Sequence, residues 1–462
     1  MPISAPTGCA PLSDEAIRRL ARCRNNADFV SEYFKALRPK PCPVLRLPTE
    51  VQRQILFLLP TDALFACIRA SAIFWRAYQA NERALLWNIL TRELGGVIVE
   101  SCTLQRLIAV FALENPSDEA REEAVERYEP AHNAMSQCYM PPWLGETLTD
   151  GEVRLMAKEY LTLIRPATKL YTNWALENLA GDTLTSRMER PSLSLSERRR
   201  VARGLYRFEM YCQLYGEHEN RDAKDSDWVL FFPDHFSFME LWEPWQIEQF
   251  RTVYLFEVDV YARVLASTLE DTTFKGPLEV YLARRGSHLP YNGLWQDAKT
   301  DQYHFENMQI GTAIRGLAPL LHIKLDFNDD DKAAFTKAVK SIAVYPDRGN
   351  PDHTVLSPET QERECDVRTA RVQKASRRDP MPFRGDGEPD AEGDRPPYAW
   401  TVMWRNRYCK LYGWFIPVYI GNGGYVMWDA ERIKTTGADR QLRGDFANAG
   451  YDMYGYVECW GW

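Results

Sequence analysis

The sequence predicts a mainly α-helical protein, in which a small N-terminal unit of three helices precedes a larger, irregular all-α domain. Apolar residues recur at three- and four-residue steps in several long segments, which is the periodicity of one helical face. Segment 194–215 is the clearest case, because Ser194 and Glu197 have the spacing of a capping box and Gly216 follows the last apolar position. Segment 244–269 shows the same periodicity over a greater length. No sustained alternation of apolar and polar residues predicts a sheet.

The remaining helices are predicted from the same periodicity and from capping residues. Thr149 and Glu152 form a second capping-box pattern, and Gly95 and Gly96 interrupt the helix in which they lie. A short alternating segment, Leu321 to Leu325, is a strand candidate without neighbours that would extend it into a sheet. The further helices are expected in segments 13–37, 93–115, 117–135 and 149–165 and from about Trp400 onward.

The length of the chain predicts more than one domain, because 462 residues exceed the roughly 100–200 residues of a typical domain. The apolar share of 45% and the charged share of 26% are those of a chain that folds. Composition divides it into an N-terminal helical and extended segment (1–43), the three-helix unit (44–92), a large helical domain (93–375), a flexible loop (376–397) and an aromatic-rich C-terminal helical segment that packs on the main domain (398–462).

Charge and hydropathy argue against two classes of partner. The net charge of -8 does not favour binding a nucleic acid through a broad basic surface. No membrane span is predicted, since the apolar stretch Ile55 to Ile68 is interrupted at Pro60 and the stretch Val253 to Leu269 contains charged residues. The beginning of the chain lacks the basic and apolar regions of a signal peptide, so we expect a cytoplasmic or nuclear protein with reduced cysteines.

Segment 44–80 carries the most informative pattern in the chain. Pro48 suits the beginning of a first helix, which Pro60 ends. Thr61 is predicted to cap a second helix and Ser71 a third. Three helices of this length bury little surface among themselves, and units this small usually need a partner or a neighbouring domain. We therefore expect an apolar face that is offered to another protein.

This segment resembles the F-box family over the whole length of the family's motif. The features that match in register are Leu47-Pro48-x-Glu50-Val51, Ile55, Leu58-Leu59-Pro60, Asp62 before Leu64, and Ser71 ahead of Trp75-Arg76. The resemblance implies binding of a Skp1-like adaptor, which joins F-box proteins to a cullin scaffold. The candidates that it implies for the Skp1 interface are Leu47, Pro48, Val51, Ile55, Leu58, Leu64 and Ile68. The sequence leaves open which face each one occupies, and the alternative is that they form the core of a helical domain.

The whole chain, with its aromatic-rich remainder and the segment Gly424 to Asp429, is similar to F-box proteins of filamentous fungi. On that resemblance it is a substrate-recognition subunit of an SCF-type ubiquitin ligase. Its large helical domain would bind an unknown protein substrate, and the chain itself would carry out no bond chemistry. Two alternatives stay open: an enzyme formed by the helical domain, and an F-box-like structural protein outside ubiquitin ligases.

No catalytic motif, cofactor-binding motif or metal-ligand pattern is found in the sequence. The seven histidines and ten cysteines are dispersed, and the glycines at 421–424 are interpreted as a turn. Asp234-His235 has the composition of an acid–base pair, but an ordinary loop histidine is the favoured interpretation. The acidic run 326–331 lacks the glycine and the last glutamate of an EF-hand loop. The arginines at 198–200 lie at a helix start among apolar positions, which favours a structural role over a phosphate contact or a nuclear signal.

Overall fold

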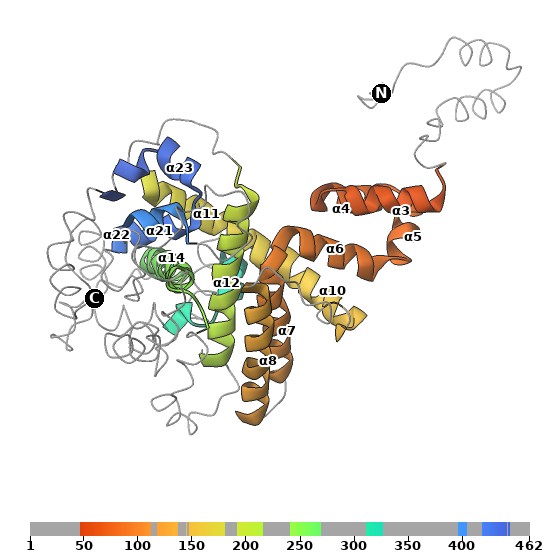
Figure 1. Cartoon of the computed structure of the whole chain (residues 1–462), viewed down its shortest axis with the longest axis horizontal. Helices are drawn as coiled ribbons and strands as arrows, with labels where there is room; N and C mark the ends of the chain where they lie inside the picture. The colour runs from red at the N-terminus through yellow and green to blue at the C-terminus, as the bar shows by residue number, and fades with distance from the viewer. Residues whose placement is uncertain are drawn as a thin grey trace, which may run out of the picture. The chain divides into compact units, whose positions relative to one another are not determined.

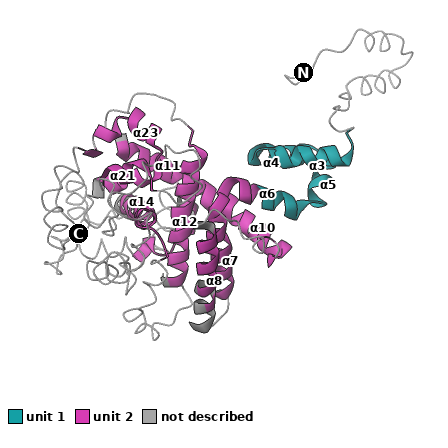
Figure 2. Cartoon of the chain, in the orientation of Figure 1, with its two compact units in different colours: residues 1–88 teal, residues 89–462 magenta. Residues whose placement is uncertain are grey.

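The structure is a computed structural model, and it describes residues 47–111, 118–136, 145, 147–180, 192–215, 241–268, 311–326, 396–403, 418–440 and 442–443. Within these residues the fold is mainly α-helical and no strand is present, which confirms the predicted fold class. The chain divides into two compact units, unit 1 (residues 1–88) and unit 2 (residues 89–462), as Figure 2 shows. The division falls inside the helix α6 (Glu82–Leu94).

The described part of unit 1 consists of short helices with very short connections (Figure 1). They are α3 (Thr49–Leu58), α4 (Thr61–Ala70), α5 (Ala72–Gln79) and the first part of α6. Pro48 and Pro60 are the N-caps of α3 and α4, with extended ψ angles of 149° and 153°. Proline suits both positions because its φ is fixed and it has no N–H to leave unpaired. Thr61 is therefore the first residue of α4 and not its cap, which corrects the prediction, whereas Ser71 is the N-cap of α5.

The interior of unit 1 is apolar and receives side chains from every described helix. Its buried apolar residues are Leu56, Leu64, Ile68, Phe74, Ala77, Tyr78, Leu85 and Leu86. One polar contact fixes α6 against the end of α3, because the Asn88 side-chain amide donates to the Phe57 carbonyl oxygen over 2.9 Å. Burial of this kind stabilises by about 25 cal/mol per Å² of apolar surface, so a core this small leaves unit 1 with little stability to spare.

Unit 2 is built on two long helices, α12 (Leu195–Tyr215) and α14 (Pro244–Thr268), which pack against each other. In Figure 1 α14 is seen nearly along its axis while α12 runs across the view, so the two helices cross steeply. Gly204 permits the close crossing, because a Cβ at this position would lie 3.1 Å from the Gln249 carbonyl oxygen. The sequence periodicity in segments 194–215 and 244–269 therefore predicted both central helices.

The other described elements of unit 2 surround this pair. They are η2 (Gly95–Val97), α7 (Ile98–Phe111), α8 (Asp118–Ser136), α10 (Asp150–Glu159), η3 (Tyr160–Ile164), α11 (Arg165–Ala180), α17 (Leu317–Asp326), α21 (Tyr398–Met403), α22 (Val418–Asn422), η8 (Tyr425–Met427) and α23 (Ala430–Thr435). Figure 1 shows α7 and α8 side by side, and α7 also packs against α12. No described helix has the length and apolar character needed to cross a lipid bilayer.

Both predicted capping boxes are present. The Thr149 hydroxyl accepts from the Glu152 N–H over 3.2 Å, and the Glu152 carboxylate accepts from the Thr149 N–H over 2.7 Å. Ser194 and Glu197 exchange the same two hydrogen bonds at 3.1 and 3.0 Å. The expected interruption at Gly95 is also found, since α6 gives way there to η2 and Gly95 has a φ of 54°.

Two predictions need correction, and two others fall mostly outside the described residues. The strand candidate Leu321 to Leu325 belongs to α17, where Leu317, Leu320 and Leu321 are buried at helical spacing. The glycine-rich turn is shorter than expected, because α22 continues to Asn422 and the turn begins only after it. The predicted helices in segment 13–37 lie outside the described residues, as does the predicted loop 376–397 apart from its last two residues, which are buried.

Candidate docking surface

One face of α3 presents apolar side chains to solvent. Pro48, Val51, Ile55 and Leu58 follow each other at three- and four-residue steps and so share one side of the helix; we call them the α3 stripe. Leu58 is 81% exposed and Val51 is 37% exposed. Pro48 is also exposed, and Ile55 is half-buried. Single exposed apolar residues are ordinary on a protein surface, but an aligned row of them marks a candidate contact face.

The opposite side of α3 explains why this stripe faces outward. Leu56 is 1% exposed and packs into the core of unit 1, and Gln52, one turn earlier, is 5% exposed. The Gln52 side-chain amide donates to the Leu47 carbonyl oxygen over 2.8 Å, which fixes the entry to the helix. Because α3 places Gln52 and Leu56 inward, the residues that follow Val51 at helical spacing point away from the core.

The seven residues predicted for the Skp1 interface divide into two groups. Leu47 is half-buried and, with the α3 stripe, lies at or near the surface of unit 1. Leu64 and Ile68 are only 1% and 6% exposed, because the face of α4 that carries them packs into the core. These two residues therefore pack in the core of unit 1 and are not part of the exposed α3 stripe.

Two further exposed apolar side chains lie on α5. Ile73 is 38% exposed and Trp75 is 45% exposed, and the Trp75 ring stacks on Tyr78 with 5.7 Å between the ring centroids. Trp75 belongs to the matching motif features, but no surface role was predicted for it. Its position directly before an arginine in a short helix was the only available signal, and the pattern alone did not decide its exposure.

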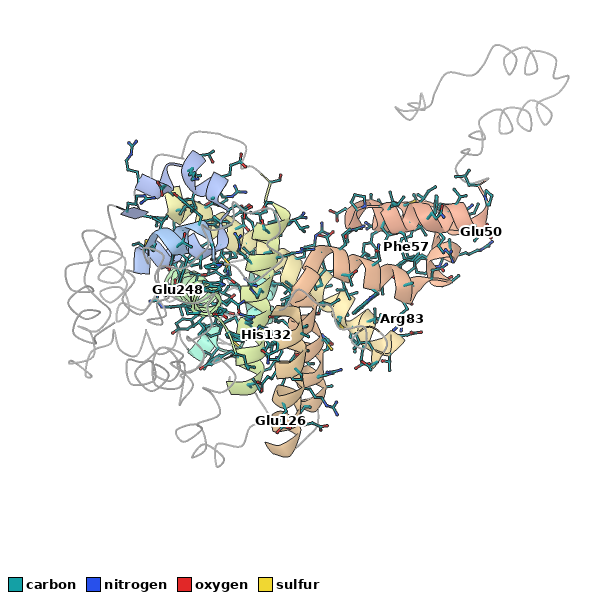
Figure 3. The ribbon with its side chains drawn as sticks, viewed as in Figure 1. Glu50, Phe57, Arg83, Glu126, His132 and Glu248 are labelled. Carbon is teal, nitrogen blue, oxygen red and sulfur yellow. The ribbon has the colours of Figure 1, made fainter. Side chains whose placement is uncertain are left out.

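Charged groups frame the beginning of α3. Glu50, labelled in Figure 3, and Arg53 are both exposed. Glu50 lies in the first turn, where the positive end of the helix dipole stabilises a carboxylate. The stripe is thus an apolar row with charges of both signs beside it, an arrangement that suits a specific protein contact better than a membrane surface.

The interior of unit 2 has a different character, because it contains a network of paired polar side chains around Arg207. Arg207 donates to the Glu100 carboxylate over 2.8 Å and to Gln246 over 2.8 Å, and its guanidinium lies 4.5 Å from the Trp242 ring centroid. Tyr128 donates to Glu100 and accepts from the Trp242 indole. Burial raises the pKa of Tyr128, so its hydroxyl stays protonated.

His132, labelled in Figure 3, ends this network. Its ring stacks on Tyr128 with 5.2 Å between centroids, and its Nε2 lies 3.1 Å from the Leu241 carbonyl oxygen. Glu248, also labelled, accepts from the Trp400 indole over 3.0 Å and from the Tyr425 hydroxyl. Both side chains make hydrogen bonds to other groups of the protein, which indicates a structural role.

A second cluster joins the beginning of α12 to the beginning of α23. Arg432 donates to both oxygens of Glu197 over 2.6 Å, and Arg200 donates to Asp429 over 2.9 Å. Asp429 also accepts from Ser196 over 2.8 Å. The basic run predicted at 198–200 is therefore engaged within unit 2, since Arg199 in turn donates to the Arg92 carbonyl oxygen.

The remaining predicted sites lie outside the part of the chain that the structure describes. They are Asp234-His235 and all but the first residue of the acidic run 326–331. Among the described residues no group of three or more His, Cys, Asp or Glu side chains could hold a metal ion.

Comparison with protein-family models, with curated proteins and with solved structures found no match to this chain.

Proposed function

We propose that the α-helical segment around α3, α4 and α5 is an F-box, and that the chain is a substrate-recognition subunit of an SCF-type ubiquitin ligase. In this proposal unit 1 binds a Skp1-like adaptor, which links it to a cullin scaffold. Unit 2 binds a protein substrate and holds it within reach of the conjugating enzyme, so that catalysis proceeds by proximity. The register of the motif from Leu47 to Arg76 supports the family assignment.

The observation that carries the proposal is the exposure of the α3 stripe. Leu58, the last residue of α3, is 81% exposed, whereas Leu56, two residues earlier, is 1% exposed. A small unit with an exposed apolar face is stabilised when a partner covers that face, because binding removes the apolar surface from water. An F-box-like protein that acts alone would be expected to cover this face itself.

The experiment that tests the proposal is co-expression of the full chain with a Skp1-like adaptor, followed by affinity purification. We expect the wild-type chain to retain the adaptor, and the double variant Val51→Asp, Leu58→Asp to lose it by at least tenfold, because two charges would be buried in an apolar contact. Since both residues are exposed, the variant should keep its fold.

A matched control comes from unit 2. Leu155, on α10, is 53% exposed and carries the same type of side chain as Leu58. The variant Leu155→Asp should retain the adaptor at the wild-type level. Failure of the wild-type chain to bind any Skp1-like adaptor would remove the proposal, and an equal loss in both variants would show that the effect is not specific to the α3 stripe.

A further inference from the structure

Three arginines of unit 2 lie close together where α6 ends and α12 begins. Arg92 and Arg198 approach the carboxylate of Glu93 from these two helices, with the nearest nitrogen and oxygen atoms 3.7 and 3.5 Å apart. The Arg199 guanidinium donates to the Arg92 carbonyl oxygen over 3.1 Å. It also lies against Gly95, where an added Cβ would be 2.6 Å from its central carbon. Arg199 thereby fixes the end of α6 against the first turns of α12 and holds Arg92 and Arg198 at the same place.

The ion pairs with Glu93 are loose, because both distances exceed the roughly 2.7–2.9 Å of a charge-assisted hydrogen bond between a nitrogen cation and a carboxylate. Arg92 Nη2 is shielded from solvent and has no hydrogen-bond partner in the described part of the chain. A buried donor without an acceptor is destabilising, so an acceptor that enters beside it would be bound favourably. The side chains of Arg92 and Arg198 are 35% and 48% exposed, so a small solute can reach both.

The Tyr160 hydroxyl is a further donor beside these groups. Tyr160 is the first residue of η3, a π-helical turn that packs against α12, and it is 8% exposed. Burial, together with the Glu93 carboxylate, raises the pKa of Tyr160 to about 12, so the hydroxyl keeps its proton at neutral pH. Three positive charges act against this rise, those of Arg165, Arg198 and Arg92. Positive charge therefore exceeds negative charge at this place, and π-helical turns occur frequently at functional sites.

The arginine run 198–200 contains two kinds of residue. Arg199 and Arg200 donate hydrogen bonds within unit 2, whereas Arg198 forms only the 3.5 Å ion pair with Glu93 among the described residues. The negative end of the α6 dipole attracts a cation, but Arg92 in the last turn of α6 already supplies one. Arg198 is therefore the residue of this run whose charge remains for a ligand.

We propose that Arg92, Glu93 and Arg198 form a site for hydrogenphosphate, in which the arginines donate to phosphate oxygens and Glu93 accepts a hydrogen bond from the P–OH group. Guanidinium groups bind phosphate oxygens through charge-assisted and often bidentate hydrogen bonds. The excess of positive charge favours a dianion over a singly charged carboxylate. Glu93 then selects among dianions, because it repels sulfate, which has no proton to donate at neutral pH. The site lies in unit 2 and is independent of the adaptor contact proposed for unit 1.

The test is isothermal titration calorimetry of the full chain at neutral pH, with sodium phosphate, sodium sulfate and O-phosphoserine as separate probes at one ionic strength. The wild type should bind phosphate saturably and bind sulfate at least tenfold more weakly. O-Phosphoserine, a phosphate ester that lacks the P–OH proton at this pH, should behave like sulfate. Arg198→Gln should weaken phosphate binding at least tenfold, because it removes a donor and a charge. Glu93→Gln should bind sulfate as tightly as phosphate, because its amide can donate to either anion.

The matched control is Arg127→Gln, since Arg127 is an exposed arginine of unit 2 that forms an ion pair with Glu123 on its own helix. This variant should bind phosphate as the wild type does, and an equal loss in it would mean that general surface charge attracts the anion. The proposal is overturned if the wild type shows no saturable phosphate binding, or if Arg198→Gln binds phosphate unchanged. Sulfate or O-phosphoserine that binds the wild type as tightly as phosphate would also overturn it.

Discussion

Units 1 and 2 use apolar and charged side chains in opposite ways. Unit 1 leaves Leu58, Val51 and Trp75 in contact with solvent, while unit 2 buries the ion pairs Arg207–Glu100 and Arg432–Glu197. An exposed apolar row lowers the free energy only when something covers it, whereas a buried ion pair is already satisfied inside the molecule. The exposed apolar row of unit 1 is the surface that the proposed adaptor would cover, whereas these charged side chains of unit 2 find their partners inside the molecule.

The largest expected effect lies in the buried network of unit 2. Arg207→Met should lower the free energy of unfolding by about 3–5 kcal/mol, because it leaves the Glu100 carboxylate buried without its cation. Arg207 and Glu100 are 1% and 3% exposed and 2.8 Å apart, so solvent offers no compensation. The measurement is urea denaturation followed by tryptophan fluorescence.

The double variant Arg207→Met, Glu100→Gln sharpens this prediction. Removing the second charge should restore more than half of the lost stability, since the main cost of the single variant is an unpaired charge. If the double variant is as unstable as the single one, the pair matters through shape and not through charge.

Local signals in the sequence predicted local structure well, and the physical reason is proximity. The capping boxes at Thr149 and Ser194 and the break at Gly95 each depend on residues within one turn. The pair Glu197–Arg432 joins residues 235 positions apart, and no spacing rule connects them. The mistaken strand at Leu321 has another cause, because His322 and Lys324 alternate with apolar residues as in a strand, and five residues are too few to separate this period from a helical one.

The candidate site was predicted in part. The motif located α3, and helical spacing grouped Val51 with Leu58, but spacing does not say which face meets the core. Leu64 and Ile68 were candidates for the same surface and are buried in the core of unit 1, since apolar residues suit a core and an interface equally well. The buried carboxyl groups of Glu209 and Glu257 were not predicted, because neither residue departs from an ordinary helical pattern.

The second prediction tests the core of unit 1 through Leu56. Leu56→Ala should destabilise unit 1 by about 2–5 kcal/mol, since Leu56 is 1% exposed and its removal leaves a cavity. Hydrogen exchange of peptides within 47–80 measures this loss without interference from unit 2. Unchanged protection in these peptides would mean that α3 does not pack as described.

The third prediction concerns pH and Glu159. Burial raises the pKa of Glu159 from an ordinary value of 4.5 to about 8, against a lowering by its hydrogen bond from Gln105. The folded chain then holds a proton that the unfolded chain has already released, so stability falls as the pH rises from 4.5 through 8. The unfolding equilibrium constant should increase about thirtyfold, or roughly 2 kcal/mol, between about pH 6.5 and 9 from this residue alone.

Glu159→Gln isolates that contribution. The variant cannot lose a proton, so denaturation curves of the wild type and the variant should diverge steadily over this range, with the wild type becoming relatively less stable. Parallel curves would show that Glu159 is ionised in the folded protein at neutral pH, and that the buried carboxyls of unit 2 are better compensated than their contacts indicate.

The smallest expected effect on stability is that of a substitution at Leu58, two residues from Leu56. Leu58→Ala should change the free energy of unfolding by no more than about 0.5 kcal/mol, because Leu58 is 81% exposed, and hydrogen exchange of the same 47–80 peptides compares it directly with Leu56→Ala. Its effect on adaptor binding should run the other way: Leu58→Ala should weaken co-purification several-fold, since the lost methyl groups would be covered only in the complex. Destabilisation by Leu58→Ala comparable to that by Leu56→Ala would mean that the α3 stripe is covered by the chain itself. Unit 1 would then have no exposed apolar row to set against the buried ion pairs of unit 2.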